Sequence, residues 1–338
     1  MNLNAVNMGI IGLGYWGPNL LRNFSGVDRC QVTACCDLDE RRWTKFASQY
    51  HRVRFFNSPQ SLFDDPQIHA VAIATPIATH HDLVKRALLA GKHVLVEKPM
   101  TTRVEEAIEL CDLANKMGLV LQMEHVFVYS PAVTKIKEIV DSGRLGKLLF
   151  IDSIRINLGL FQHDVNVLWD LAPHDLSIID YLMQRSPISL VANGSSHTTS
   201  GIEDVAYLNM DFGDGLMANV HVNWLSPVKI RSMIIGGSEQ SLVYNDLDQS
   251  EKVRVYNRGV NITTSEQIQK VLIKYRTGDM WSPDISHDEP LFLMATDFIE
   301  SIHEGRKPVA DAQSGLRLVK ILAAAQHSIK HQGERVVL

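Results

Sequence analysis

The stretch Gly12-Leu13-Gly14-Tyr15-Trp16-Gly17 decides the fold of the first part of this chain. It follows an apolar run over residues 6–11 that predicts a buried strand, and it precedes a helix predicted over residues 18–26. A strand, a G-x-G-x-x-G turn and a helix in this order are typical of a dinucleotide-binding site. Gly12 allows the tight turn, Gly14 lets the backbone approach the phosphates, and Gly17 lets helix and strand pack closely. The N–H groups at the helix start are expected to face the pyrophosphate.

A second predicted strand, over residues 31–36, ends at Asp37, twenty residues after Gly17. A carboxylate at this position accepts hydrogen bonds from the adenosine ribose and disfavours a 2′-phosphate, so NAD is the expected cofactor. Arg41 and Arg42 follow closely and could reach such a phosphate, which keeps NADP as the alternative. In this region we predict cofactor contacts from Gly12, Gly14, Tyr15, Trp16, Gly17, Asp37, Leu38 and Arg41.

Composition narrows the class of protein. The chain has 338 residues with 45% hydrophobic content, which is enough for two domains with separate cores. Its net charge of −5, without a basic block, makes nucleic acid an unexpected partner, and no apolar run is long enough to span a bilayer. The N-terminus does not resemble a signal peptide, and the four cysteines lack C-x-x-C spacing. We therefore expect a cytoplasmic protein with reduced cysteines and no metal site.

Apolar and polar runs alternate regularly from residue 6 to residue 122. Strands are predicted over residues 6–11, 31–36, 53–55, 70–74, 93–96 and 119–122, and helices over residues 18–26, 39–50, 59–63, 80–90 and 103–117. Such alternation predicts an α/β domain of the Rossmann type, a doubly wound parallel sheet with helices on both faces. We assign this cofactor-binding domain to residues 1–125. Ligands of such sheets bind at the carboxyl ends of the strands, where we look for the chemistry.

Several polar residues directly follow these predicted strands. They are Thr75, Pro76 and His80 after the fourth strand, Glu97 and Lys98 after the fifth, and Glu124 and His125 after the sixth. We predict that all except His125 contact the cofactor, with Thr79 as the cap of the helix that follows. A lysine at a strand end is usually solvated, but the position of Lys98 at this edge favours a functional role. A cis bond to Pro99 would aim Lys98 into the crevice.

The remaining residues, 126–338, read as a second domain for substrate binding and oligomerisation. Strands are predicted over residues 147–158, 188–198, 203–212, 216–224, 228–236, 239–245 and 252–256, and helices over residues 132–142, 290–304 and 314–332. Apolar and polar residues mix along these strands, which predicts an α+β domain with one open, mainly antiparallel sheet. The last helix is expected to pack back on the first domain. Helices can cover one face of the sheet, and we expect a partner subunit, in a homodimer or homotetramer, to cover the other.

A helix predicted to begin at Asp170 carries the second candidate for chemistry. Asp170 and His174 are four residues apart and therefore share one helix face, whereas Asp175 is expected to point toward solvent. A carboxylate beside an imidazole is a general-base arrangement, and Lys98 could stabilise a developing alkoxide. The same spacing is explained equally well if Asp170 caps the helix and His174 has only a structural role. Pro173 is tolerated if it falls in the first turn.

Taken together, these motifs resemble the Gfo/Idh/MocA family of oxidoreductases over nearly the whole chain. The residues that carry the resemblance are the glycine turn, Asp37, Ala74-Thr75-Pro76 with His80, Glu97-Lys98-Pro99, and Asp170 with His174. The resemblance implies Lys98 and His174 as catalytic residues assisted by Asp170, NAD or NADP as cofactor, and a polyhydroxylated substrate. Many members carry a glycine-rich segment where this chain has Asn166-Val167-Leu168-Trp169, so the substrate is not carried over. Candidate substrate contacts are Lys98, Arg155, Asn157, Gln162, His163, Asp164, Asn166, Asp170 and His174.

The sequence therefore favours an NAD-dependent dehydrogenase that acts on a ring hydroxyl of a sugar or nucleotide sugar, in sugar or polysaccharide biosynthesis. An NADPH-dependent ketosugar reductase is the second hypothesis, because hydride transfer is reversible. A non-catalytic dinucleotide-binding sensor of the same fold is the third, and the intact Lys98, Asp170 and His174 argue against it. Glycoside cleavage with a retained NAD is a further alternative within the resemblance.

Overall fold

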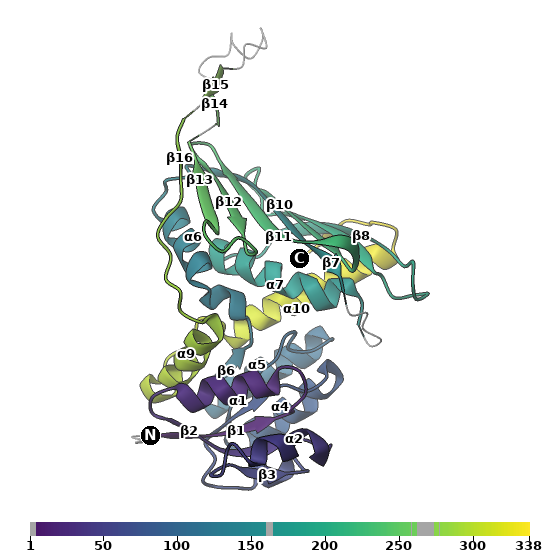
Figure 1. Cartoon of the computed structure of the whole chain (residues 1–338). Coiled ribbons are helices and arrows are strands. Elements are labelled where there is room, and N and C mark those ends of the chain that lie inside the picture. Colours follow the sequence, from purple (N-terminus) through teal and green to yellow (C-terminus); the bar gives the residue numbers. More distant parts are fainter. Residues whose placement is uncertain (1–4, 160–164, 258, 262–273, 277) are drawn as a thin grey trace. The chain divides into compact units, whose positions relative to one another are not determined.

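The computed structural model describes residues 5–159, 165–257, 259–261, 274–276 and 278–338, and these form two compact units (Figure 1). Unit 1 consists of Met1–Ser130 and Asp288–Ala323, and unit 2 consists of Pro131–His287 and Ala324–Leu338. Asp164, together with Gln162 and His163, lies outside the described residues.

Unit 1 is built on a six-stranded parallel sheet of order β3-β2-β1-β4-β5-β6. The strands are β1 (Val6–Ile11), β2 (Cys30–Cys36), β3 (Arg54–Phe56), β4 (Ala70–Ile73), β5 (His93–Val96) and β6 (Leu121–Met123). The connecting helices are α1 (Gly17–Gly26), α2 (Glu40–Ala47), α3 (Gln60–Phe63), α4 (His80–Leu89) and α5 (Val104–Met117), with 3₁₀ turns η1 (Ile77–Thr79) and η2 (Val126–Tyr129). The central strand β4 is buried along its whole length, as expected for a strand covered on both faces. The predicted Rossmann-type sheet is confirmed.

Unit 1 also contains a segment from the far end of the chain. Helix α9 (Pro290–Glu304) packs against α1 and η2, where Phe298 meets Phe24 edge-to-face at 6.0 Å between ring centroids. At its start, Glu289 accepts two hydrogen bonds from the Arg22 guanidinium, at 2.9 and 2.5 Å. Buried apolar contact and an ion pair therefore hold α9 on the first unit.

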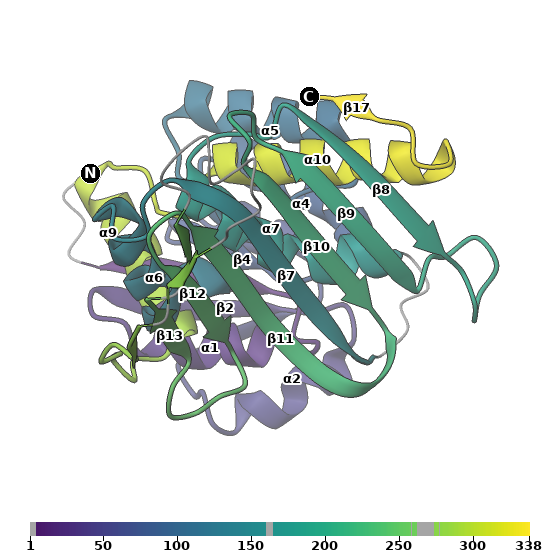
Figure 2. The same ribbon diagram turned by 90° about the horizontal axis from the view of Figure 1, so that it is seen from above.

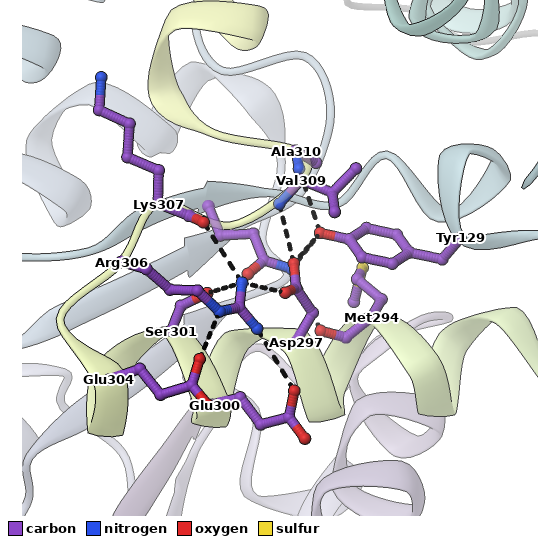
Figure 3. A network of polar contacts seen from close by, with 11 residues as sticks. Tyr129, Met294, Asp297, Glu300, Ser301, Glu304, Arg306, Lys307, Val309 and Ala310 are labelled. Atoms are coloured by element: carbon purple, nitrogen blue, oxygen red, sulfur yellow. Dashed lines mark hydrogen bonds and ion pairs between the residues drawn. The ribbon is translucent and has the colours of Figure 1, made fainter. Parts of the chain in front are cut away.

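A polar network then fixes the chain between α9 and α10 (Ala312–Lys330) along β6 (Figure 3). Asp297 accepts hydrogen bonds from the Tyr129 hydroxyl at 2.7 Å and from Arg306 at 2.6 Å. The backbone N–H of Met123 donates to the carbonyl of Ala310 at 2.8 Å, so this segment borders the last strand of the sheet. The assignment of all residues 126–338 to one second domain is corrected accordingly. Residues 288–323 belong to unit 1 because their apolar and polar partners lie there.

Unit 2 holds a nine-stranded sheet of order β16-β13-β12-β11-β7-β10-β9-β8-β17, most of which lies side by side in Figure 2. Its strands are β7 (Leu148–Leu158), β8 (Ser189–Ser195), β9 (Val205–Asp211), β10 (Met217–Asn223), β11 (Leu225–Gly237), β12 (Ser241–Asn245), β13 (Val253–Tyr256), β16 (Met280–Trp281) and β17 (Val336–Val337). All neighbours pair antiparallel except β10 and β7, which are parallel. The predicted mainly antiparallel sheet is confirmed. A separate pair, β14 (Gly259–Asn261) and β15 (Lys274–Arg276), and the strands β16 and β17 were not predicted.

Helices α6 (Pro131–Asp141) and α7 (Val167–Met183) belong to the same unit, and α7 packs against β7, β9 and β10. Helix α7 begins three residues before the predicted Asp170, because Asn166 caps it by accepting a hydrogen bond from the N–H of Trp169 at 3.2 Å. Pro173 consequently lies inside the helix, beyond the first turn where we expected it.

The two faces of the unit 2 sheet differ in exposure. Ile151, Ser153 and Arg155 of β7 are buried on one face. On the other face, strand register aligns a set of large apolar side chains that are 36–53% exposed, namely Phe150, Tyr207, Met217, Ile230 and Ile234. We call this set the open face.

Candidate functional site

The glycine turn of unit 1 requires glycine at two positions for different reasons. Gly12 has φ +93°, a left-handed conformation that disfavours side chains, and a Cβ there would lie 2.5 Å from the carbonyl oxygen of Ala74. A Cβ at Gly17 would lie 1.9 Å from the carbonyl oxygen of Gly12, so the helix start packs directly on the turn. At Gly14 the nearest atom to such a Cβ is Nη1 of Arg42, at 3.2 Å, and the backbone faces open space otherwise.

The start of α1 is arranged to receive an anion. Its N-cap residue is Trp16, which makes no side-chain cap hydrogen bond, and Pro18 occupies the first turn, where no N–H partner is needed. The N–H groups of Asn19 and Leu20 donate to the carbonyl of Trp16, so this start offers a phosphate group mainly the positive end of the helix dipole. Tyr15 is 84% exposed and Leu38 is 81% exposed beside this turn, so apolar surface is available to a bound molecule.

Asp37 is held in place by backbone donors. Its Oδ2 accepts a hydrogen bond from the N–H of Leu13 at 2.7 Å, and its Oδ1 accepts one from the N–H of Asp39 at 2.9 Å. The carboxylate is thus fixed by the turn after β1 and by the turn before α2. This arrangement suits the recognition of ribose hydroxyls.

A cavity of about 510 Å³ adjoins these groups at the carboxyl ends of the parallel strands. Its lining brings together the predicted Gly12, Gly14, Asp37, Leu38, Thr75 and Pro76. Sequence reasoning missed Pro59, Asp82 and Leu83, which also line it. Their position in the sequence could have indicated them, because α3 and α4 begin just after the ends of β3 and β4.

Two arginines at this cavity have different surroundings. Arg41 binds both carboxylate oxygens of Asp39, at 2.8 and 2.9 Å, and its side chain is 90% exposed. Arg42 lines the cavity, with its Nη1 at 3.8 Å from Oδ2 of Asp37. The basic residue in the cavity wall is therefore Arg42, whereas Arg41 is paired with Asp39 and its contact to the cofactor stays a prediction.

The ends of β5 and β6 place a cluster of ionisable groups close together. The Lys98–Pro99 bond is cis, and the N–H of Lys98 donates to Oε2 of Glu97 at 3.0 Å. Burial, and next the charge of Glu97, raise the pKa of Glu124 well above its usual range. Burial, followed by the charges of Lys98 and Arg317, lowers the pKa of His125 to about 3. Lys98 and Arg317 are therefore the cations that act on this cluster, and Glu97 is the acid beside Glu124.

His80 is a structural residue here, which revises its prediction as a cofactor contact. The ring is 1% exposed, and its two nitrogens lie 3.0 Å from the carbonyl oxygen of Pro99 and 2.9 Å from that of Thr75. Burial lowers the pKa of His80. The imidazole thus joins the turns that carry Thr75 and Lys98 and has no surface left for a ligand. Thr79 occupies the cap position of α4 without a side-chain cap bond.

In unit 2, Asp170 and His174 lie on one face of α7, and both are partly exposed. Oδ2 of Asp170 accepts a hydrogen bond from the indole Nε1–H of Trp224 at 3.1 Å. Helix capping belongs to Asn166, so Asp170 is not the cap that the structural alternative required. Trp224 was missed by sequence reasoning. The sequence indicated it only as a tryptophan at the junction of two predicted strands.

Arg155 is buried, which contradicts its prediction as a substrate contact. Its side chain is 2% exposed and binds Asp175, with Nε at 2.6 Å from Oδ2 and Nη2 at 3.2 Å from Oδ1. Ser153 also donates to Asp175, at 2.9 Å. The expectation of a solvated Asp175 is wrong for the same reason, because β7 turns Arg155 toward α7.

Asn166 is likewise occupied by structural contacts. Besides capping α7, its amide nitrogen donates to Glu203 and, at 2.7 Å, to Gln326. Both amide hydrogens are used in these contacts, and the role of Asn166 as a substrate contact stays a prediction. Asn157 is partly exposed near the end of β7, and its role stays a prediction. The predicted contact from Asp164 cannot be placed, since it lies outside the described residues.

The described part of the chain contains no cluster of three or more histidine, cysteine or acidic residues that could hold a metal ion. Among its helices, none is sufficiently long and apolar for a transmembrane span.

Comparison with known families agrees with the site of unit 1. A family model described as "Oxidoreductase family, NAD-binding Rossmann fold" matches residues 6–125, and one described as "GFO/IDH/MocA C-terminal domain" matches residues 133–243. Together they cover more than half of the chain. The uncapped helix start, the glycine turn and Asp37 are the parts that hold NAD in such a domain.

Individual relatives match over nearly the full length. UDP-N-acetylglucosamine 3-dehydrogenase of Acidithiobacillus ferrooxidans is 27% identical over 320 residues, which cover 94% of this chain and 94% of that protein. The scyllo-inositol 2-dehydrogenase (NAD(+)) of Bacillus subtilis is 23% identical over 341 residues, covering 97% and 95%. A solved structure of the first relative superposes with a TM-score of 0.81 at 23% identity, over 97% of this chain and 98% of that one, and shows the same fold.

Proposed function

Because this chain belongs to the Gfo/Idh/MocA family of NAD-binding oxidoreductases, we propose that it transfers hydride between NAD and a ring hydroxyl of a nucleotide sugar. The observation that carries the proposal is the pair Asp170 and His174 on α7, with Asp170 oriented by Trp224. The choice of a nucleotide sugar is supported by a full-length relative named UDP-N-acetylglucosamine 3-dehydrogenase. We place the reaction in sugar or polysaccharide biosynthesis.

The residues divide the chemical work as follows. His174 takes the proton of the reacting hydroxyl, and Asp170 on the same helix face stabilises the imidazolium that results. Lys98 stabilises the negative charge that develops on the oxygen. Bound NAD supplies the hydride acceptor. Asp37 and the start of α1 would bind its ribose and pyrophosphate.

A second function is favoured by one specific observation. Arg42 lines the cavity next to Asp37, where a 2′-phosphate of NADP would find a cation. An NADPH-dependent ketosugar reductase would use the same residues in the reverse direction, with His174 donating the proton.

The test is the appearance of reduced nicotinamide when purified protein meets NAD or NADP with UDP- and dTDP-sugars, their uronates, free sugars and inositols. We expect a signal with NAD and one nucleotide sugar. Lys98→Ala and His174→Ala are expected to lower kcat by about a thousandfold with folding intact. Lys85→Ala and His327→Ala serve as controls, one in each unit, and both should retain full activity.

The other outcomes decide between the alternatives. A signal only with free inositols would reject the nucleotide-sugar substrate. NADPH consumption with a ketosugar, without the oxidation reaction, would favour the reductase. If no panel member reacts, assay of nucleotide released by denaturation shows whether NAD is retained, and hydrolysis of a glycoside then separates glycoside cleavage from the dinucleotide-binding sensor. Normal turnover in either alanine variant would remove that residue from the mechanism.

We also propose that two copies of the chain associate through the open face, as a homodimer or within a homotetramer. The exposed apolar side chains of Phe150, Met217 and Ile234 lie on this face, and a partner would remove them from water. The mass from light scattering is expected to equal two or four chains. A mass of one chain at assay concentration would reject the proposal.

A cytoplasmic location is proposed from the cysteines. All four are free thiols, and burial raises the pKa of Cys35 and of Cys36 to about 12. Such thiols persist in a reducing compartment. Cell fractionation with an antibody against the chain would test this, and recovery from a secreted fraction would refute it.

A further inference from the structure

We propose that Trp224 is a positioning residue that fixes the carboxylate of Asp170 for catalysis, an inference that rests on the function proposed above. Trp224 lies at the junction of β10 and β11, 1% exposed, and its Nε1–H donates to Oδ2 of Asp170 at 3.1 Å. An indole nitrogen can only donate, so this contact is specific for an acceptor oxygen. A purely apolar role for the ring would not require the nitrogen to face the carboxylate.

Unit 2 holds the indole rigidly from several sides. The backbone N–H of Trp224 donates to the carbonyl of Asp204, and its carbonyl accepts from the N–H of Gly159, both at 2.9 Å. A Cβ at Gly159 would lie 2.8 Å from Cδ1 of the ring, so glycine is needed where the indole packs. The position of Nε1 is therefore set by the sheet.

Asp204 anchors this arrangement. It is fully buried and accepts hydrogen bonds from the backbone N–H groups of His197 and Thr198, both at 2.8 Å, and from the His197 ring at 2.7 Å. A residue with this many partners cannot shift without breaking several bonds. The chain of contacts from Asp204 to Trp224 to Asp170 thus links the β8–β9 connection to the functional face of α7.

The physical consequence is a defined orientation for Asp170. A carboxylate in the first turn of a helix can rotate about its Cβ–Cγ bond, and a hydrogen bond from a fixed donor restricts that rotation. His174 lies one turn further along the same helix face, so a fixed carboxylate presents a constant acceptor to that face. Preorganised hydrogen bonds of this kind add to catalysis by removing reorganisation during the reaction.

The kinetic test is a double-mutant cycle with UDP-N-acetylglucosamine and NAD as the first substrates tried. Trp224→Phe keeps an aromatic ring and removes the donor, and we expect kcat to fall about tenfold to a hundredfold with an unchanged Kd for NAD. Added to Asp170→Ala, the same change should cause no further loss, because it acts through that carboxylate. Independent, additive losses would overturn the proposal.

Two controls separate positioning from packing. Replacement of Trp224 by 3-benzothienylalanine keeps the ring shape and loses only the N–H, so it should reproduce the effect of Trp224→Phe. If it retains full activity, the indole acts by packing alone. Tyr244→Phe removes a buried hydrogen bond to Asp246 elsewhere in unit 2 and should leave kcat unchanged.

A spectroscopic measurement tests the contact even if the proposed substrate class is wrong. The five tryptophans give five indole N–H signals in ¹⁵N-labelled protein, and Trp224→Phe identifies one by its loss. Asp170→Ala should shift this signal upfield and leave the other buried indoles nearly unmoved. An unchanged signal would overturn the proposal, whereas a shift without turnover by the wild type would place the failure in the proposed function.

Discussion

Asp37 in unit 1 and Asp170 in unit 2 are both oriented carboxylates, but they are held by different kinds of groups. Backbone N–H groups of Leu13 and Asp39 fix Asp37. A side chain distant in sequence, Trp224, fixes Asp170. The first arrangement depends on the path of the main chain and the second on the identity of one residue.

This difference shows which substitutions each region tolerates. The cofactor site fails when the backbone path is blocked, because its donors are peptide groups that every residue supplies. The unit 2 site fails when a particular partner is lost, as with Trp224 and Asp170 or with Arg155 and Asp175. The predictions below test this contrast, in order of decreasing effect.

Gly17→Ala should have the largest effect, about 5 kcal/mol in the free energy of unfolding, together with loss of NAD binding. Its Cβ would lie 1.9 Å from the carbonyl oxygen of Gly12, and backbone cannot move aside there without breaking the turn. Urea unfolding and calorimetric titration with NAD measure the two effects. In Gly14→Ala the Cβ meets only the mobile end of Arg42, so the protein should stay folded while NAD binds more weakly. Equal destabilisation by both variants would contradict the backbone argument.

Arg155→Met should cost about 3 kcal/mol of unfolding free energy, because Asp175 would remain buried without its cation. The double variant Arg155→Met with Asp175→Leu should recover most of this loss, since no charge remains buried. Denaturant unfolding of the three variants completes the cycle. A variant with normal stability and a raised KM for the sugar would instead restore Arg155 as a substrate contact.

His93 should make stability depend on pH. Its Nδ1 accepts a hydrogen bond from the N–H of Val120 at 3.0 Å. Burial lowers the pKa of His93 to about 4, and the charge of His69 adds to this effect. Neutral His93 contributes to the free energy of unfolding in full above its unfolded pKa near 6.5. This contribution is lost as the pH falls toward 4, and roughly 2 kcal/mol is lost by about pH 5. His93→Asn keeps an acceptor that does not titrate, so its unfolding free energy should fall less between neutral pH and about pH 5. Parallel curves for the two proteins would refute this assignment.

Asp39→Ser should have the smallest effect and should alter cofactor preference. Serine still caps α2, but Arg41 loses its carboxylate partner and Arg42 keeps only Asp37 at 3.8 Å, so both become more available to a 2′-phosphate. We expect the Kd for NADP to fall severalfold while that for NAD changes less than about twofold, as for other exposed ion pairs. Asp82→Asn removes an equal charge from the cavity wall, where Asp82 pairs with Arg86, and is the control. Equal shifts in both variants would indicate a general charge effect.

The sequence predictions succeeded where local backbone patterns decide the structure and were less informative where distant side chains meet. Element positions and the need for glycine at Gly12 and Gly17 follow from local patterns, and the structure agrees with both. Polarity along a strand or loop suggested Arg155 and Asn166 as substrate contacts, but the structure pairs Arg155 with Asp175 and Asn166 with Glu203. Polarity shows that a residue needs partners, but its partners depend on packing.

The sequence by itself determined the parallel sheet, the glycine turn with its acidic partner, and the spacing of Asp170 and His174. These features depend on periodicity and short separations, which a linear pattern records. Tertiary structure alone decided that residues 288–323 complete unit 1 and that Arg155 is buried against Asp175. It also brought Trp224 to Asp170 across 54 residues of chain. The reason is that these contacts join distant segments, whose meeting is fixed by the packing of helices on the sheets.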